Sequence, residues 1–523
     1  MKDCYLNLQL ENETLGNNPK LRSTKKGVID ESVKREIPLK NAVVKNHCNT
    51  LRMNFAGNYV VEFRVFDNGG AYRFITDKKG DNIVMGEDFV LNFPANYKAH
   101  LSQPNGFKTS YEYPYTHVNT EEYKATDRMS YLPILLETDK PYKILISEAD
   151  LHDYPCMFLK STGRNGMQSL FPKVPLEFGE DGDRSLKILK ETDYIAKTAG
   201  KRSFPWRFMV ITKEDKQLLE NEMVYNLSTP CVLEDYSWIK PGQVIREVTL
   251  TTAGSMACID FAAENNIAYV LFDAGWYGAE EDVKSDATTV TVDPARSKGP
   301  LDLPKVIEYA NSKGVGILVY VNKKALHQQL DEILPLYKKW GIKGVKYGFV
   351  NVGDQYATAW LHQAVRKAAK YGLMVDIHDE YRLTGYSRTY PNLLTQEGIR
   401  GDEESPSLDQ AIYTLYNRMI CGAGDYTNCY FAERVTEKMG GRAAQLAKLV
   451  AIYSPWQFVY WYDRPEKSPR RAGGAGSAES VIKTDAEPVS IILFRPYGTK
   501  LASWREKWEN MLWSPAVRVP IGM

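Results

Sequence analysis

The chain has 523 residues, of which 43% are hydrophobic and 25% are charged, and its formal net charge is +1. These values are typical of a globular protein long enough for about two to four domains. The near balance of 66 basic and 65 acidic residues provides no excess of positive charge for nucleic acid. We therefore expect no nucleic-acid partner.

The seven cysteines are scattered, odd in number and free of CxxC spacing. This pattern argues against a disulfide framework and against a structural zinc site. No apolar run reaches the length of about 18 residues that indicates a membrane span. The first residues, MKDCYLNLQLENE, lack the apolar segment of a signal peptide. Taken alone, the sequence predicts a protein without a membrane span that stays in the cytoplasm.

Residues 1–238 are predicted to form an antiparallel β-sandwich. Apolar and polar residues alternate in runs such as NYVVEFRVFD and YKILISEAD, and Gly, Pro, Asn and Asp separate these runs. Long helical periodicity is absent from this part of the sequence. The sandwich is expected to end near SWIKPG, a connection that contains Pro241 and Gly242.

Residues 239–465 are predicted to form a (β/α)8 barrel. Short apolar strands alternate with helix-like segments: AYVLFDAGW precedes LDLPKVIEYANSKG, and GILVYV precedes LHQQLDEILPLYKKWG. Seven strands are clear in this pattern, and an eighth, near Asp425–Tyr430, is weaker. Repeated βα units of this length favour a closed barrel, with a doubly wound open sheet as the alternative.

Residues 466–523 are predicted to be a linker and an atypical tail. The linker SPRRAGGAGSAES has low complexity, and the tail, which contains GTKLASWREKWENMLW, lacks the periodicity of a third domain. We therefore predict two folded domains.

Seven carboxylates lie between Asp376 and Glu404, where two predicted strands give way to loops. In parallel α/β folds, ligands bind outside the carboxyl ends of the strands. An acidic cluster at such a place can bind a hard cation, or act as general acid and base, or do both. The alternative is a solvated loop rich in charge.

Glu397 and Glu403 lie on either side of a Gly-Ile-Arg-Gly bend. The two glycines allow the loop to fold back, so that both carboxylates can face one point. Two carboxylates around one cation suit calcium, and a pair that flanks a scissile bond suits glycoside hydrolysis. A metal-dependent phosphatase or lyase would use such a pair as well, so the spacing leaves these activities open.

Several motifs resemble those of glycoside hydrolase family 97, whose members remove terminal sugars from α-linked and related glycosides and depend on calcium. The motifs that carry the resemblance, in chain order, are FRVFDNGGAYRF (63–74), ISEADL (146–151), PWRFMVI (205–211), SWIKPG (237–242), IDFAAENNIAYVLFDAGWY (259–277), HDEYRLTGYSRTYPNLLTQEGIRGDEE (378–404) and SPWQFVYWYDRP (454–465). The resemblance implies an N-terminal β-sandwich, a (β/α)8 barrel and a C-terminal β-sandwich. The last of these is apparently missing here.

The resemblance also implies roles for individual residues. Glu403, in RGDEE, matches the general acid of the family. The carboxylates that align with calcium ligands are Glu148, Asp379, Glu397 and Glu403. Three further residues are expected to contact the substrate: Trp276, His378 and Arg388.

Strand four carries the motif VKYGFV, in which Gly348 stands where retaining members of the family have an aspartate nucleophile. Glycine has no nucleophile, so the resemblance implies hydrolysis with inversion. The general base is then Asp379 at the end of strand five, or the adjacent Glu380, because the usual glutamate of strand three is missing near Asn322 and Lys323.

Taken together, the resemblance predicts a calcium-dependent, exo-acting α-glycosidase that acts on terminal glucose or galactose of an oligosaccharide. The alternatives are α-galactosidase specificity and a truncated, non-catalytic carbohydrate-binding remnant. Both ends depart from the family pattern, which leads to the hypothesis of an incomplete or frame-shifted reading frame. The parent protein would then be periplasmic or secreted. The sequence predicts no particular oligomeric state.

Overall fold

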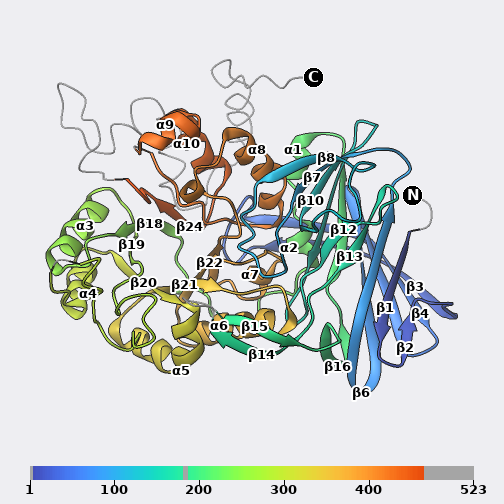
Figure 1. Cartoon of the computed structure of the whole chain (residues 1–523), viewed down its shortest axis with the longest axis horizontal. Coiled ribbons are helices and arrows are strands. Elements are labelled where there is room, and N and C mark those ends of the chain that lie inside the picture. The colour runs from blue at the N-terminus through green and yellow to red at the C-terminus, as the bar shows by residue number, and fades with distance from the viewer. Residues whose placement is uncertain (1–3, 181–185, 298, 431, 464–523) are drawn as a thin grey trace. The chain divides into compact units, whose positions relative to one another are not determined.

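The computed structural model describes residues 4–180, 186–297, 299–430 and 432–463, which belong to one compact unit. A β-rich N-terminal part is followed by alternating strands and helices (Figure 1). The predicted linker and tail, 466–523, lie outside the described residues. Among the described residues, no helix has both the length and the apolar character needed to cross a membrane.

The N-terminal part is antiparallel and is organised around the long strand β6 (Gly69–Asn92). This strand pairs with β1, β5, β13, β16 and β17, and the main sheet runs in the order β3-β4-β5-β6-β17-β11-β10-β7-β8. The other strands are β1 (Tyr5–Leu10), β2 (Glu13–Leu15), β3 (Leu21–Lys34), β4 (Val43–Phe55), β5 (Tyr59–Phe66), β7 (Lys98–Ser102), β8 (Tyr115–Asn119), β9 (Ser130–Tyr131), β10 (Ile134–Glu137), β11 (Lys143–Ala149), β12 (Phe158–Ser161), β13 (Gly166–Leu170), β14 (Pro175–Glu180), β15 (Leu186–Glu191), β16 (Ala196–Ser203) and β17 (Trp206–Thr212). Strands β14 and β15 form a separate two-stranded sheet.

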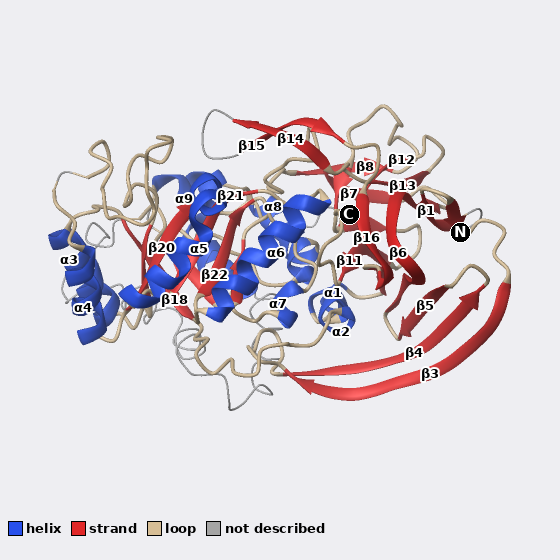
Figure 2. Ribbon diagram, turned by 90° about the horizontal axis from the view of Figure 1, so that it is seen from below, coloured by secondary structure: helices blue, strands red, loops and turns tan. Residues whose placement is uncertain are grey.

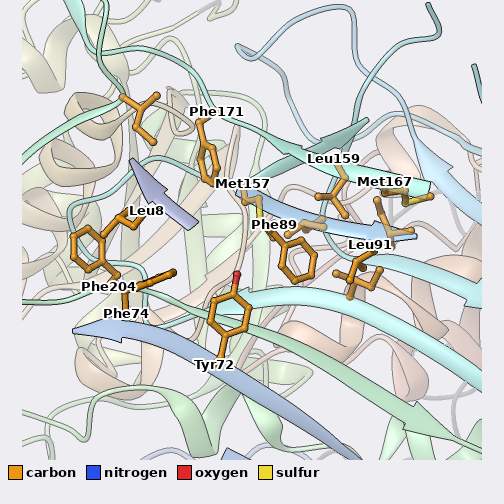
Figure 3. Close-up of a cluster of buried hydrophobic side chains, with 14 of the residues drawn as sticks. Leu8, Tyr72, Phe74, Phe89, Leu91, Met157, Leu159, Met167, Phe171 and Phe204 are labelled. Atoms are coloured by element: carbon orange, nitrogen blue, oxygen red, sulfur yellow. The ribbon is translucent and has the colours of Figure 1, made fainter. Parts of the chain in front are cut away.

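The core of this domain is a cluster of buried apolar side chains from strands that are distant in the sequence. Leu8 is fully buried, and Phe74 is 1% exposed. Figure 3 shows both of them in this cluster with Phe89 and Met157. Burial of such apolar surface is the main favourable contribution to folding. The two short helices α1 (Asp215–Leu219) and α2 (Met223–Leu227) then lead into the second domain.

The second domain is a parallel sheet of seven strands in the order β23-β22-β21-β20-β19-β18-β24 within the described residues. Its first strand pairs with both the second and the last, so the sheet curls back on itself. The strands are β18 (Gly242–Glu247), β19 (Tyr269–Phe272), β20 (Gly316–Asn322), β21 (Gly344–Val350), β22 (Met374–Asp379), β23 (Leu393–Gln396) and β24 (Trp456–Val459). Figure 2 shows the helices that lie beside these strands.

The helices of this domain mostly connect one parallel strand to the next. They are α3 (Thr252–Glu264), α4 (Leu303–Ser312), α5 (Lys323–Trp340), α6 (Gln355–Lys370), α7 (Tyr386–Thr389), α8 (Leu408–Tyr416), α9 (Glu433–Lys438) and α10 (Gly441–Ala451), with the 3-10 helices η1 (Asp402–Glu404) and η2 (Arg418–Cys421). The N-cap residues Asn322 and Asp354 begin α5 and α6, and each accepts a hydrogen bond from a backbone N–H three residues later. Both polar residues therefore start helices at the carboxyl ends of strands.

An irregular segment around 425–428 closes the gap between β23 and β24. The N–H of Asp425 donates to the carbonyl of Gln396 (2.9 Å), and the N–H of Asn428 donates to the carbonyl of Phe458 (3.2 Å). The weak strand expected near Asp425–Tyr430 is thus absent from the structure, although its backbone bonds to both neighbours. The prediction of a sandwich followed by a parallel barrel is confirmed, with a barrel that is nearly closed.

The sandwich packs against loops that follow the barrel strands. The N–H of Cys156 donates to the carbonyl of Gly353 (2.7 Å), and the N–H of Asp150 donates to the carbonyl of Thr384 (2.8 Å). Gly353 follows β21 and Thr384 follows β22. Since loops at the carboxyl ends of barrel strands form the ligand site, the sandwich lies next to the mouth of the barrel.

A first prediction concerns the tight packing of Gly344 at the start of β21. A Cβ atom at this position would lie 2.4 Å from Cη2 of Trp456 and 2.5 Å from the carbonyl oxygen of Met374. Gly344→Ala should therefore lower the free energy of unfolding by about 1–3 kcal/mol, as overpacking does. Gly106→Ala is the matched control, because nothing lies within 4 Å of its Cβ position. Equal midpoints of denaturant unfolding for the two variants would contradict the prediction.

Candidate active site

Polar side chains form a ring above the apolar interior of the barrel. In the hydrogen-bonded register, Tyr320 of β20 lies beside Lys346 of β21, which lies beside Asp376 of β22. Residues in register on adjacent strands point to the same face of the sheet. One level further in, Leu318 and Leu271 belong to the buried apolar cluster of the barrel. The ring therefore marks where the barrel core ends and its mouth begins.

Lys346 carries a buried positive charge in this ring. Its side chain is 2% exposed, and its Nζ lies 4.1 Å from the ring centre of Trp461. Burial acts to lower the pKa of Lys346, but the carboxylates of Asp273, Asp425 and Asp376 outweigh this effect and raise the pKa above its usual value. The ammonium group therefore stays protonated and balances part of the negative charge at the mouth.

Three predicted residues form a compact cluster beyond the ring. One ligand atom from each of His378, Glu397 and Glu403 lies within 4.8 Å of the other two. His378 Nδ1 lies 2.9 Å from Glu397 Oε2, and its Nε2 lies 4.0 Å from Glu403 Oε2. The N–H of Asp379 also donates to Glu397 Oε2 at 2.5 Å. The ends of β22 and β23 and the 3-10 helix η1 thus converge, as the sequence predicted for Asp379, Glu397 and Glu403.

The two glycines of the GIRG bend permit this convergence. Gly398 has a φ of +58°, and a Cβ atom there would lie 1.7 Å from the carbonyl oxygen of Tyr381. A Cβ on Gly401 would lie 2.8 Å from the carbonyl oxygen of Tyr426. Any side chain would push the loop away from both backbones. The close approach brings Glu403 back toward Glu397.

Burial and mutual repulsion shape the protonation of the cluster. Burial, with a smaller contribution from the carboxylates of Asp379 and Glu403, raises the pKa of Glu397 to about 7 against the opposing effect of His378. Burial also acts to lower the pKa of His378, but the carboxylate of Glu397 outweighs it and raises the pKa well above the usual value. The imidazole is therefore a cation among carboxylates.

Glu112 adds a further carboxylate from the sandwich, which the sequence analysis did not identify. Burial raises its pKa well above the usual value, and Glu397 and Asp379 raise it as well. Its carbonyl oxygen accepts a hydrogen bond from Arg400 Nη1 (3.3 Å), which ties the segment to the barrel loop. Glu112 lies in an irregular stretch between β7 and β8, so no strand-end pattern pointed to it.

Asp379 ends strand β22, and Glu380 follows it, beside the end of β21. Asp379 Oδ2 accepts a hydrogen bond from the N–H of Phe349 (2.6 Å), and Glu380 Oε2 accepts one from Asn351 Nδ2 (2.5 Å). Burial acts to raise the pKa of Asp379, but hydrogen bonds from His378 and from Phe349 lower it below its usual value. Asp379 also has a φ of +68°, a conformation that is uncommon outside turns and sites.

The structure places Glu148 in a buried ion-pair network between the sandwich and the loop that follows β22. Glu148 lies on β11 opposite Arg207 of β17 and is fully buried. Its carboxylate forms ion pairs with Arg207 and with Arg382, and one of its oxygens accepts a hydrogen bond from the N–H of Met157 (3.2 Å). Arg207 also binds Glu87 through two nitrogen atoms, at 2.7 and 2.8 Å. Glu148 thus links the sandwich to the loop that follows β22.

Two predicted substrate contacts are buried and bonded to backbone carbonyl groups. Trp276 is fully buried, and its Nε1 donates to the carbonyl of Tyr320 (2.7 Å). Arg388 is 7% exposed and donates to the carbonyl oxygens of Tyr225 (2.6 Å) and Ser228 (2.9 Å). Their contacts support the packing of the barrel and of the domain interface. Of the three predicted contacts, only His378 belongs to the cluster at the mouth.

The position of Gly348 is filled by another side chain. A Cβ atom on Gly348 would lie 2.0 Å from Cε2 and 2.5 Å from Oη of Tyr320. The aromatic ring of Tyr320 therefore occupies the space that a side chain at position 348 would need. The structure thus provides no carboxylate at this point of strand β21.

This arrangement can hold a divalent cation and can exchange protons with a bound ligand. Glu403 is partly exposed, with a side chain that is 23% accessible, whereas Glu397 is 2% accessible. A partly exposed carboxyl group beside buried charges suits a general acid, and the buried carboxylates suit a hard cation. The sequence predicted no role for Lys346 or Trp461, although they lie in the motifs VKYGFV and SPWQFVYWYDRP.

Comparisons with known proteins match both parts of this fold. A family model described as "Glycosyl-hydrolase 97 N-terminal" matches residues 1–230, and one described as "Glycoside hydrolase 97" matches residues 238–399. The boundary between the two matches falls in the segment that joins the sandwich to the barrel.

Two curated relatives are similar in sequence. The chain is 32% identical over 497 residues to a "Retaining alpha-galactosidase" of Bacteroides thetaiotaomicron, with 87% of this chain and 73% of the relative covered. It is 27% identical over 443 residues to a "Probable retaining alpha-galactosidase" of Streptomyces bingchenggensis, with 81% and 63% covered. A solved glycoside hydrolase family 97 enzyme from Pseudoalteromonas sp. strain K8, in complex with acarbose, has a TM-score of 0.76 at 22% identity over 88% of this chain and 76% of that chain.

A prediction follows for Glu148 from its two arginine partners. Glu148→Gln leaves Arg207 and Arg382 without a shared counter-charge in a buried place, so the free energy of unfolding should fall by about 3–5 kcal/mol. Chemical denaturation measures this change. Asp77→Asn is the control, because Asp77 pairs with Lys201 at 3.7 Å on an exposed surface and should change the stability little. An unchanged stability of the Glu148 variant would contradict the prediction.

Proposed function

The chain belongs to glycoside hydrolase family 97 and is a glycoside hydrolase with α-glycosidase activity, and from this premise we propose that it releases terminal α-linked galactose with inversion and requires calcium. The two curated relatives, at 32% and 27% identity, are both named α-galactosidases, which favours galactose over glucose. The observation that carries the proposal is the cluster of His378, Glu397 and Glu403 at the mouth of the barrel.

Glu403 is proposed as the general acid that protonates the departing sugar oxygen. It lies on the short helix η1, and its backbone is anchored because Arg434 Nη1 donates to the Glu403 carbonyl (3.0 Å). Its Oε1 faces the hydroxyl of Tyr462 at 3.4 Å. Partial exposure lets this carboxyl group recover a proton from solvent after each turnover, which a general acid needs.

Inversion is proposed because residue 348 of strand β21 is a glycine and carries no carboxylate. The ring of Tyr320 fills the space beside it. Inverting hydrolysis needs a base that activates water instead of a carboxylate that attacks the sugar. Asp379 and Glu380 are the candidates for this base from the sequence. The word "retaining" in the names of the two relatives describes those proteins, and the stereochemical experiment below decides the point for this chain.

The carboxylates of the cluster fit calcium in kind and in charge. We propose Glu397, Glu403 and Asp379 as ligands, with Glu112 instead of Glu148 as the contribution of the sandwich. Calcium prefers oxygen ligands, and several buried carboxylates that raise one another's pKa supply an excess of negative charge for it. When bound, the ion would polarise a sugar hydroxyl or the leaving oxygen as a Lewis acid.

The proposal on stereochemistry and acid catalysis is tested with aryl α-galactosides. NMR should detect the β-anomer of galactose as the first product of the wild type. Glu403→Gln should lower kcat by about 10²–10⁴-fold for substrates with poor leaving groups, and less for activated ones, because a good leaving group needs no proton. Glu404→Gln is the control, because Glu404 is exposed and pairs with Arg400 at 3.2 Å. Full activity of Glu403→Gln would dismiss the assignment.

A second test separates calcium binding from activity. Added calcium should raise the melting temperature of the chelator-treated wild type, since a ligand that binds the folded state stabilises it. Glu397→Gln and Glu112→Gln should each reduce this shift, whereas Glu404→Gln should preserve it. Calorimetric titration with calcium provides the affinity directly. An absent shift in the wild type, or turnover that persists in chelator, would remove calcium from the proposal. A folded wild type without any turnover would favour the non-catalytic remnant.

A further inference from the structure

We propose that Glu280, acting through the hydroxyl of Tyr320, accepts the proton of the water that attacks the sugar. This inference rests on the inverting hydrolysis proposed above. It assigns the role of base to a residue outside the motifs that suggested the function. It also explains how the mouth of the barrel gains a carboxylate on the side of strand β20, whose sequence GILVYVN contains none.

The loop between β19 and α4 delivers Glu280 to the end of strand β20. Gly275 and Gly278 in this loop have φ values of +100° and +120°, which favour glycine. The carbonyl of Glu280 accepts a hydrogen bond from Asn322 Nδ2 (3.0 Å). Arg296 Nη2 lies 3.4 Å from Glu280 Oε2. Glu280 is 9% exposed, and these contacts hold both its backbone and its side chain in place.

The hydroxyl of Tyr320 joins this carboxylate to the space beside Gly348. Tyr320 donates a hydrogen bond to Glu280 Oε1 at 2.5 Å. Its ring fills the position of a side chain at 348, with Oη only 2.5 Å from the Cβ position. The oxygen of Tyr320 therefore stands where a side chain of residue 348 would begin. A hydroxyl that donates to a carboxylate can still accept a hydrogen bond from water.

The other two candidates for the base are engaged differently. Asp379 Oδ2 receives the N–H of Phe349, and Asp379 is also proposed as a calcium ligand, which would make its carboxylate a weaker base. Glu380 Oε2 receives the amide of Asn351. Glu280 instead bonds to the hydroxyl of Tyr320 and lies beside Arg296.

The proposed step moves two protons. The water oxygen forms a bond with the anomeric carbon while the bond from that carbon to the leaving oxygen breaks, and Glu403 gives its proton to the leaving oxygen. The water proton passes to Tyr320 Oη as the phenolic proton of Tyr320 passes to Glu280. Glu280 then ends protonated and Glu403 ends ionised, and exchange with solvent restores both. Burial and the charge of Glu280 raise the pKa of Tyr320 well above its usual value, so the phenol is protonated at the start.

The experiment compares Glu280→Gln and Tyr320→Phe with the wild type on 4-nitrophenyl and 2,4-dinitrophenyl α-galactosides. Loss of the base slows water attack whatever the leaving group, so kcat should fall by about 10²–10⁴-fold for both substrates. The double variant should be no slower than the slower single variant, because both residues serve one relay. Glu281→Gln, at the exposed neighbouring residue, should keep the wild-type kcat.

Sodium azide separates a catalytic role from a structural one. Azide is already an anion and needs no proton acceptor, so it should restore turnover of Glu280→Gln and give the β-galactosyl azide. A damaged fold would instead lower the melting temperature and would not respond to azide. Glu280→Asp, which keeps a carboxylate, should recover part of kcat without azide. Loss of activity without azide rescue and without recovery by Glu280→Asp would overturn the inference.

Three further outcomes identify which proposal fails. A wild type that inverts while Glu280→Gln keeps its kcat overturns this inference and leaves the proposed function intact. A wild type that retains configuration overturns the inverting reaction itself. An activated 2-deoxy-2-fluoro-galactoside that labels Tyr320 in mass spectrometry would also overturn the relay, because Tyr320 would then be the nucleophile.

Discussion

The geometry of the site depends on the contact between Gly398 and the carbonyl of Tyr381. With only a hydrogen atom at this point, the loop after β23 can turn directly against the loop after β22. Glu397 then reaches His378, and the chain returns at η1 with Glu403. A larger residue would separate the two loops, and the acidic side chains would face solvent singly instead of forming one charged site.

This convergence is electrostatically unfavourable, because it brings like charges together in a place with little water. The protein offsets part of the repulsion with cations of its own, His378 inside the cluster and Lys346 in the ring below it. The proposed calcium ion would balance the remaining negative charge. The sandwich takes part in this balance through Glu112 and holds the neighbouring loop through Glu148 and Arg382.

The sequence predicted the fold well because the fold follows from local patterns. Alternation in β5 and apolar runs such as GILVYV in β20 are visible without any long-range contact. The bend between Glu397 and Glu403 was also visible, since its glycines mark it. The weak strand expected near Asp425 is not formed. An irregular segment takes its place and donates single backbone hydrogen bonds to β23 and β24.

Residues that depend on contacts across the chain were harder to place. Glu112 and Glu148 both lie in the sandwich, and only the packing of the domains decides which of them approaches the barrel mouth. Arg207 stands opposite Glu148 in the sheet register, and spacing along the sequence does not reveal this partner. Trp276 likewise follows a strand in the sequence. In the structure it is fully buried, and its indole N–H donates a hydrogen bond to the carbonyl of Tyr320.

The mutual fit of Tyr320 and Gly348 has a consequence for how this chain can change over generations. An acidic side chain at 348 would collide with the phenol ring, and a small residue at 320 would leave a hole beside a bare glycine. Each substitution alone thus disturbs the packing between neighbouring strands. A chain with this pair can therefore gain a strand-four nucleophile only if both positions change together.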